Sequence, residues 1–150
     1  MALGILLLAG CEKSLSPAEQ KVEDDRAVAQ VEATERALPP LRPVSPQPLP
    51  RTFVARHAVG GEGCAFIVAG DTVVALTLGT RAQLMIDGQP AVFSADKGAA
   101  RLPGGAWSHY DGKALALGVT QDAHGARLVV LDPYNRPAYQ VSGTLRCPAI

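Results

Sequence analysis

The sequence predicts an all-β domain in which about eight short antiparallel strands form a meander that closes into a small barrel or sandwich. Two observations lead to this prediction. After Arg51, short apolar runs alternate with glycine-containing turns at intervals of roughly ten residues. No apolar run with a helical period separates them. Closure is favoured because it leaves no sheet edge exposed.

The composition divides the chain into three pieces. Six of the 12 prolines lie between residues 39 and 50, and every Phe, Tyr and Trp follows Arg51. We therefore expect a signal peptide at 1–10, an anchor and stalk at 11–50, and a β domain at 51–150. The 14 Lys and Arg balance the 14 Asp and Glu, so the chain has no net charge to attract nucleic acid, and we expect no such partner.

The first ten residues, MALGILLLAG, form an uncharged apolar run that is too short to span a bilayer as a helix. Such a run is typical of the core of a signal peptide, although no Lys or Arg precedes it, and we expect translation to start upstream of Met1. The alternative is a short buried segment with an ordinary cysteine. The next feature favours the signal peptide: Leu8-Ala9-Gly10-Cys11 resembles the lipobox of bacterial lipoproteins.

The lipobox resemblance implies that Cys11 is lipidated. Its thiol would carry a diacylglyceryl group, the chain would be cut before it, and the new N-terminus would be acylated by a fatty acid such as palmitate. Several acyl chains hold a protein on a membrane more firmly than one chain can. The resemblance therefore implies a protein of the bacterial cell envelope, anchored in either membrane and facing the periplasm.

The stalk is expected to combine a helix with an extended spacer. Ser16-Pro17-Ala18-Glu19 has the form of a capping box, which predicts a helix over 17–38. The apolar stripe of this helix is thin, so we expect it to be solvated and partly formed. Residues 39–50, PPLRPVSPQPLP, predict a polyproline II spacer of roughly 37 Å. Their PxxP spacing also fits ligands of SH3 domains, but a spacer explains the composition without a partner.

Within the β domain, the strongest local signal is Asp87-Gly88, which predicts a two-residue type I′ hairpin turn because both residues accept a positive φ. The eight runs that fit strands are 64–68, 72–78, 81–86, 89–93, 106–110, 113–120, 127–131 and 138–146.

Two cysteines remain once Cys11 is assigned to lipid. Cys64 and Cys147 lie near the two ends of the domain, and in an oxidising compartment they are expected to form a disulfide. In the chain-entropy model such a bridge contributes about 4 kcal/mol. A metal-binding or nucleophilic pair is the alternative, but neither cysteine has a CxxC partner or a nearby histidine in the sequence.

The residues that usually carry enzyme chemistry form no recognised motif. His57, His109 and His124 stand apart, without the spacing of a metal site. Ser108 and His109 are neighbours, but adjacent residues of a strand point to opposite faces. The sequence therefore predicts no catalytic residue, metal or cofactor, and we expect a non-enzymatic protein. An envelope enzyme without a recognisable motif is an alternative.

A binding surface is expected in the middle of the domain. An exposed Trp and Tyr among basic residues are typical of interface hot spots, although Trp107 also fits a place in the core. The candidate surface comprises Lys97, Arg101, Trp107, Tyr110 and Lys113.

The same stretch carries a family resemblance. Gly98-Ala99-Ala100-Arg101 followed by Trp107-Ser108, within a domain of about 100 residues behind a lipobox, is similar to the membrane-bound inhibitors of c-type lysozyme. That family inserts a loop into the lysozyme cleft, and Lys97-Gly98 stands where it has Ser-Gly. The leading hypothesis is a lipid-anchored envelope protein whose β domain has a binding or structural role. A lysozyme-inhibitor-like module is the alternative.

Overall fold

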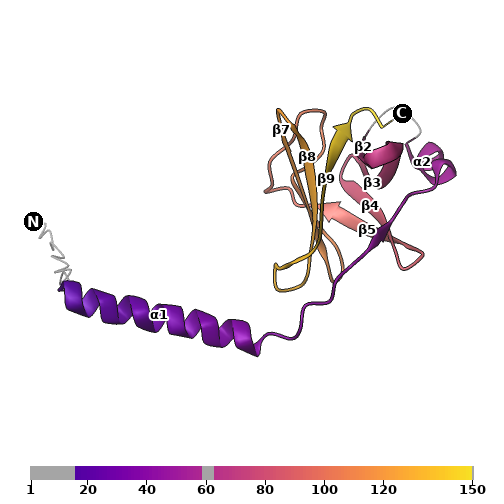
Figure 1. The fold of residues 1–150 in the computed structure, drawn as a ribbon. Coiled ribbons are helices and arrows are strands. Elements are labelled where there is room, and N and C mark those ends of the chain that lie inside the picture. Colours follow the sequence, from indigo (N-terminus) through magenta and orange to yellow (C-terminus); the bar gives the residue numbers. More distant parts are fainter. Residues whose placement is uncertain (1–15, 59–62, 150) are drawn as a thin grey trace, which may run out of the picture. The chain divides into compact units, whose positions relative to one another are not determined.

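The computed structural model describes residues 16–58 and 63–149. The chain forms two compact units, Met1–Pro39 and Pro40–Ile150 (Figure 1). Cys11 and the rest of the lipobox lie outside the described residues.

The first unit contains the helix α1 (Pro17–Ala37), which confirms the predicted helix and its cap. The Ser16 hydroxyl accepts a hydrogen bond from the Glu19 amide, and the Glu19 carboxylate accepts one from the Ser16 amide. No residue of α1 is buried. None of the helices in the described residues is both long and apolar enough to cross a membrane.

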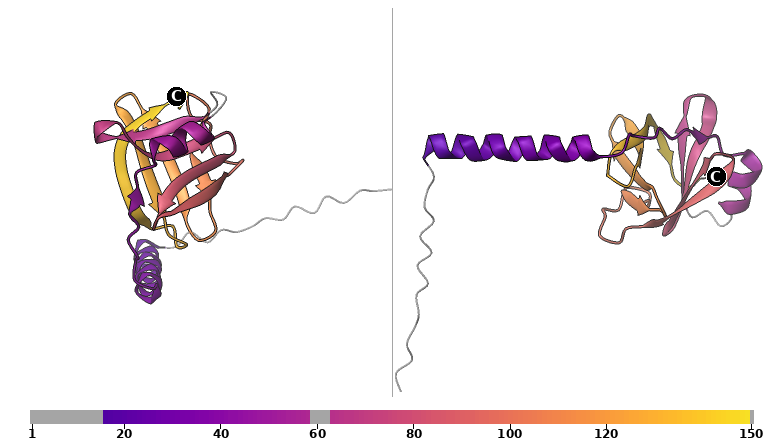
Figure 2. Two further views of the ribbon diagram at one scale, coloured as in Figure 1. Left: turned by 90° about the vertical axis from the view of Figure 1, so that its right-hand side faces the viewer. Right: turned by 90° about the horizontal axis from the view of Figure 1, so that it is seen from below.

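The second unit is a closed eight-stranded antiparallel barrel, as the sequence predicts. Each strand from β2 to β9 pairs with the next, and β9 returns to pair with β2 (Figure 2). A short additional strand, β1, pairs with β4. The elements are β1 (Pro46–Gln47), α2 (Arg51–His57), β2 (Cys64–Val68), η1 (Ala69–Asp71), β3 (Thr72–Leu78), β4 (Arg81–Ile86), β5 (Gln89–Ala95), β6 (His109–Asp111), β7 (Ala116–Asp122), β8 (Gly125–Leu131) and β9 (Pro137–Arg146).

Side chains fill the interior of the barrel. Tyr110, Phe66 and Phe93 are its largest buried members, and leucines and valines from β4, β7 and β8 pack around them. Inward and outward residues alternate along each strand, as the pleat requires. Because the interior is occupied by the chain's own side chains, the outer surface and the two ends of the barrel are the parts open to other molecules.

A second, smaller core lies outside the barrel wall. The outward side chains of Ala65, Ile67 and Leu76 are buried beneath Val54 of α2 and Leu49. Leu49 lies just before α2 in the chain. β2 is therefore apolar on both faces, which explains why Cys64–Val68 is a continuous apolar run rather than an alternating one.

The compact barrel unit begins at Pro40, before the predicted start of the β domain at Arg51, and part of the predicted spacer makes contacts with the barrel. The Val44 amide donates to the Ala138 carbonyl oxygen at 3.1 Å, and the Leu49 amide donates to that of Val73 at 2.7 Å. The side chain of Leu49 is only 5% exposed. The second half of the proline-rich segment therefore belongs to the barrel.

Most strand limits agree with the predictions, and three strands match at both ends. Asp87 and Gly88 adopt the predicted positive φ values of 51° and 74°. The largest differences, of three residues, are at the starts of β6 and β7; β5, β8 and β9 differ from the prediction by one or two residues at one end. The Gly112 amide donates to the Leu115 carbonyl oxygen at 2.8 Å, so residues 112–115 form a turn and β7 begins after the predicted start at 113.

Candidate functional site

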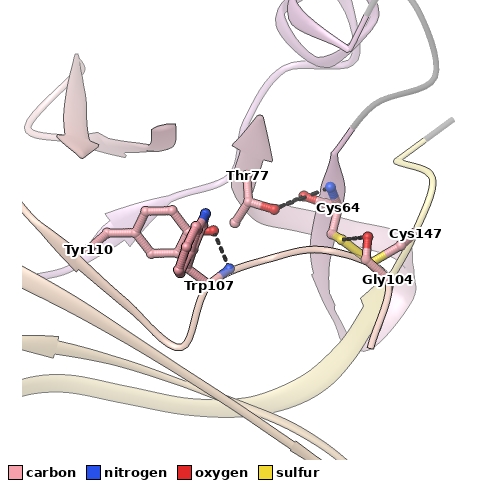
Figure 3. Close-up of a disulfide and its surroundings, with 6 residues drawn as sticks. All are labelled: Cys64, Thr77, Gly104, Trp107, Tyr110 and Cys147. Carbon is pink, nitrogen blue, oxygen red and sulfur yellow. Dashed lines mark hydrogen bonds between the residues drawn. A yellow bond between two sulfur atoms is a disulfide. The ribbon is translucent and has the colours of Figure 1, made fainter. Parts of the chain in front are cut away.

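The barrel is closed covalently where its first and last strands meet. Cys64 begins β2 and Cys147 follows β9, and the two form the predicted disulfide, with 4.3 Å between their Cα atoms (Figure 3). The hydroxyl of the buried Thr77 on β3 accepts a hydrogen bond from the Cys64 amide and donates one to the Cys64 carbonyl oxygen. The disulfide thus joins β2 to the end of β9, and the hydrogen bonds of Cys64 connect it to β3 as well.

A hairpin at the same end of the barrel packs on this disulfide. We call residues 100–108, in the connection from β5 to β6, the rim hairpin. The Leu102 amide donates to Ala106 and the Ser108 amide donates to Ala100, at 2.7 and 2.8 Å. At its tip, Gly104 has a φ of +90°, and a Cβ atom there would lie 2.6 Å from the Cys147 sulfur. Only glycine allows this close approach without displacing the disulfide.

Two predicted site residues meet on the rim hairpin. Arg101 and Trp107 are paired across it, and the guanidinium of Arg101 lies 4.6 Å from the centre of the Trp107 ring. Arg101 is exposed, whereas Trp107 is partly buried against the core. Such a cation–π pair presents a positive charge on a flat apolar support, a combination enriched in binding interfaces.

A hollow of about 430 Å³ opens beside this pair. It is lined by Thr77, Arg101, Gly104 and Gly105, and also by Cys147 and Pro148. Small-molecule and partner sites often lie at the mouths of β-barrels, and this hollow combines exposed glycine backbone with one cationic side chain. The Pro103-Gly104-Gly105 turn was recognisable in the sequence, but its contact with the disulfide was not.

The structure corrects one member of the predicted surface. Tyr110 is fully buried in the barrel, and its hydroxyl accepts a hydrogen bond from the Trp107 amide at 2.8 Å (Figure 3). Burial raises the pKa of Tyr110, so its hydroxyl stays protonated at neutral pH. The role of Tyr110 is therefore to hold the base of the rim hairpin, and it is not available to a partner.

The two predicted lysines lie apart from each other. Lys97 is exposed beside the rim hairpin, in a turn where the Asp96 carboxylate accepts a hydrogen bond from the Gly98 amide. Lys113 lies in the turn from β6 to β7. Successive connections of an antiparallel meander alternate between the two ends of a barrel, so Lys113 lies at the end away from Arg101.

The three histidines have separate local contacts. The His57 ring stacks on Phe53 at 4.1 Å, and Nε2 of His109 lies 3.3 Å from a carboxylate oxygen of Asp111. His124 is exposed in the turn before β8. In the part of the chain that the structure describes, no three His, Cys, Asp or Glu residues gather as metal ligands would.

In comparisons with known proteins, no family model, curated protein or solved structure matches the chain.

Proposed function

We propose that this chain is a lipid-anchored protein of the bacterial cell envelope, and that its barrel binds a partner through the rim hairpin. The observation that carries the proposal is the disulfide. It uses both cysteines of the barrel, which leaves Cys11 as the third cysteine of the chain, directly after the apolar run that resembles a lipoprotein signal. Disulfides of this kind persist in oxidising compartments, which supports an exported protein.

The anchor is tested by metabolic labelling with an alkyne analogue of palmitate in a Gram-negative host. We expect the full chain to carry the label and to fractionate with membranes, and Cys11→Ser to lose the label. The matched control is the double variant Cys64→Ser, Cys147→Ser, which should keep the label because the thiol of Cys11 remains. An unlabelled wild-type chain with two free barrel thiols would contradict the proposal.

The arrangement of the rim hairpin favours one class of partner, c-type lysozyme. The residues that carry the resemblance to the membrane-bound lysozyme inhibitors, Gly98–Arg101 with Trp107 and Ser108, lie on or beside one hairpin. Arg101 is exposed on it and carries a charge opposite to that of a carboxylate-lined cleft. The charge of this hairpin therefore suits a cleft of that kind.

An inhibition assay with bacterial cell walls and a c-type lysozyme tests this partner. We expect the chain to slow lysis at micromolar concentration, and Arg101→Ala to weaken inhibition about tenfold or more, as for a hot-spot residue. Arg127→Ala, an exposed arginine on β8, is the matched control and should inhibit like the wild type. No inhibition by the wild-type chain would exclude lysozyme and leave the anchor proposal intact.

A further inference from the structure

A second hollow lies on the outer wall of the barrel. It has a volume of about 630 Å³ and lies between α2 and the connection from β2 to β3. Its apolar lining comes from Leu49, Val54 and Val73, which belong to the outer core. The hollow is therefore built on packed residues rather than on a loose loop.

Two arginines from distant parts of the chain line this hollow. Arg51 begins α2 and is exposed, and Arg146 ends β9 with 62% of its side chain exposed. Guanidinium groups bind phosphate with paired, charge-assisted hydrogen bonds. The hollow thus combines an apolar floor with two groups suited to phosphate.

One acidic side chain competes for this site. A carboxylate oxygen of Asp71 lies 3.8 Å from the Arg146 guanidinium, which is longer than a direct hydrogen bond, and its side chain is 80% exposed. Asp71 is placed there by a backbone φ of +57° after Gly70. Two positive charges face one negative charge, so the lining of the hollow is net cationic.

We propose that this hollow binds the phosphate-bearing headgroup of an anionic phospholipid in the membrane that carries the lipid anchor. The proposal rests on the anchor under the proposed function. An apolar floor beneath cationic groups matches the glycerol and phosphate of a headgroup. The lipid anchor raises the effective concentration of headgroups at the site to about the millimolar range. A site with weak affinity is therefore enough to keep the barrel on the membrane surface.

The test uses a chain that begins at Glu12, so that binding through the hollow is measured without the lipid and without the apolar run at 1–10. The chain is sedimented with vesicles of phosphatidylcholine, or of phosphatidylcholine with phosphatidylglycerol, at low salt. We expect binding to the anionic vesicles only. Arg51→Gln with Arg146→Gln should reduce the partition coefficient about 30-fold, because each basic residue near an anionic surface contributes about fivefold.

A variant that is expected to bind vesicles more strongly provides a second, independent test. Asp71→Asn removes the competing charge and should raise the partition coefficient several-fold. Asparagine tolerates the positive φ at this position, so the local backbone is kept. The control pair Arg81→Gln with Arg127→Gln makes the same change in net charge at exposed positions on β4 and β8, and should change binding much less.

Three results would overturn the proposal. Equal losses in the two arginine pairs would mean that net charge alone drives binding. Binding of inorganic phosphate without binding of anionic vesicles would make the hollow a site for the free anion. Absence of vesicle binding, in a chain whose wild type is labelled at Cys11, would refute lipid binding at the hollow and leave the anchor proposal intact.

A different result separates the two proposals. Vesicle binding by a chain whose wild type takes no label would support lipid binding at the hollow and refute the anchor proposal. The unfolding midpoint of each variant verifies its fold.

Discussion

Asp132 shows at the residue scale how one side chain organises a turn of the barrel. Its side chain is only 8% exposed, in the connection from β8 to β9. One carboxylate oxygen accepts hydrogen bonds from the Tyr134 and Arg136 amides at 2.9 and 2.8 Å, and the other accepts from the Arg136 guanidinium at 2.7 Å. Burial by itself raises the pKa of Asp132, but these hydrogen bonds and the charge of Arg136 outweigh it and hold the pKa below 3.8.

Replacing this carboxylate should destabilise the protein in a pH-dependent way. The depressed pKa means that ionised Asp132 stabilises the fold above the pKa of the unfolded chain, near 4, and that this contribution disappears as the pH falls through the lower pKa of the folded chain. We expect Asp132→Asn to lower the Tm by several degrees at pH 7 and by much less near pH 2. Thermal melts across this range test the prediction. A difference that stays constant down to pH 2 would show that the charge is not the cause.

Gly104 determines how closely the rim hairpin approaches the disulfide. Gly104→Ala would place a methyl group 2.6 Å from the Cys147 sulfur at a φ of +90°. We expect a loss of unfolding free energy of about 1–3 kcal/mol from overpacking, added to about 1 kcal/mol from the unfavourable φ. Gly79→Ala is the matched control, because its φ is also positive but its Cβ would meet nothing within 4 Å. Urea unfolding of both variants should separate the two costs, and equal losses would show that the contact is unimportant.

At the scale of elements, α1 depends on local interactions because none of its residues is buried. Its capping box and the i,i+4 pairs Lys21–Asp25 and Glu32–Arg36 are the contacts that support it. Most helices gain their stability from tertiary packing, so a helix without such packing is sensitive to its ends.

The cap of α1 should therefore have a measurable effect. Ser16→Ala removes the side-chain oxygen that accepts from the Glu19 amide, at a cost of about 1 kcal/mol. We expect lower helicity over the first two turns of α1 in NMR chemical shifts, with the barrel signals unchanged. Val22→Ala, at an exposed position, is the control and should not lower helicity, since alanine favours helix. Unchanged shifts in Ser16→Ala would exclude the cap as a determinant.

Elements that local chemistry determines lie where the sequence predicts them. Asp87-Gly88 requires a tight hairpin, and Ser16 with Glu19 requires a cap, so both elements lie where the residues indicate. The helix α2 was not predicted, because it is only seven residues long and begins after Pro50 without a side-chain cap. Val54 holds this helix against the outer core, and that contact depends on strands distant in the chain.

The candidate site was predictable only in part for the same reason. Arg101 and Trp107 were predicted from their residue types, and they lie together because they flank one turn and hairpin neighbours are close in sequence. Tyr110 was misplaced, since its burial depends on the register of β6 with β5 and β7. The hollow between Arg51 and Arg146 joins two ends of the barrel unit, and no local pattern links residues so far apart.

At the scale of the whole molecule, the extent of the barrel unit gives the clearest prediction. A chain that begins at Arg51 has every strand of the closed barrel but lacks Leu49, the short strand β1 and the hydrogen bonds from Val44 and Leu49. Burial of one leucine contributes about 2 kcal/mol and each hydrogen bond about 1 kcal/mol.

We expect a chain that begins at Pro40 to be more stable than one that begins at Arg51 by about 4 kcal/mol in urea unfolding. Leu49→Ala in the longer chain should reproduce at least half of this loss, because the side chain fills the outer core beside Val54. Equal stability of the two chains would mean that residues 40–50 act as the spacer that their proline content suggests.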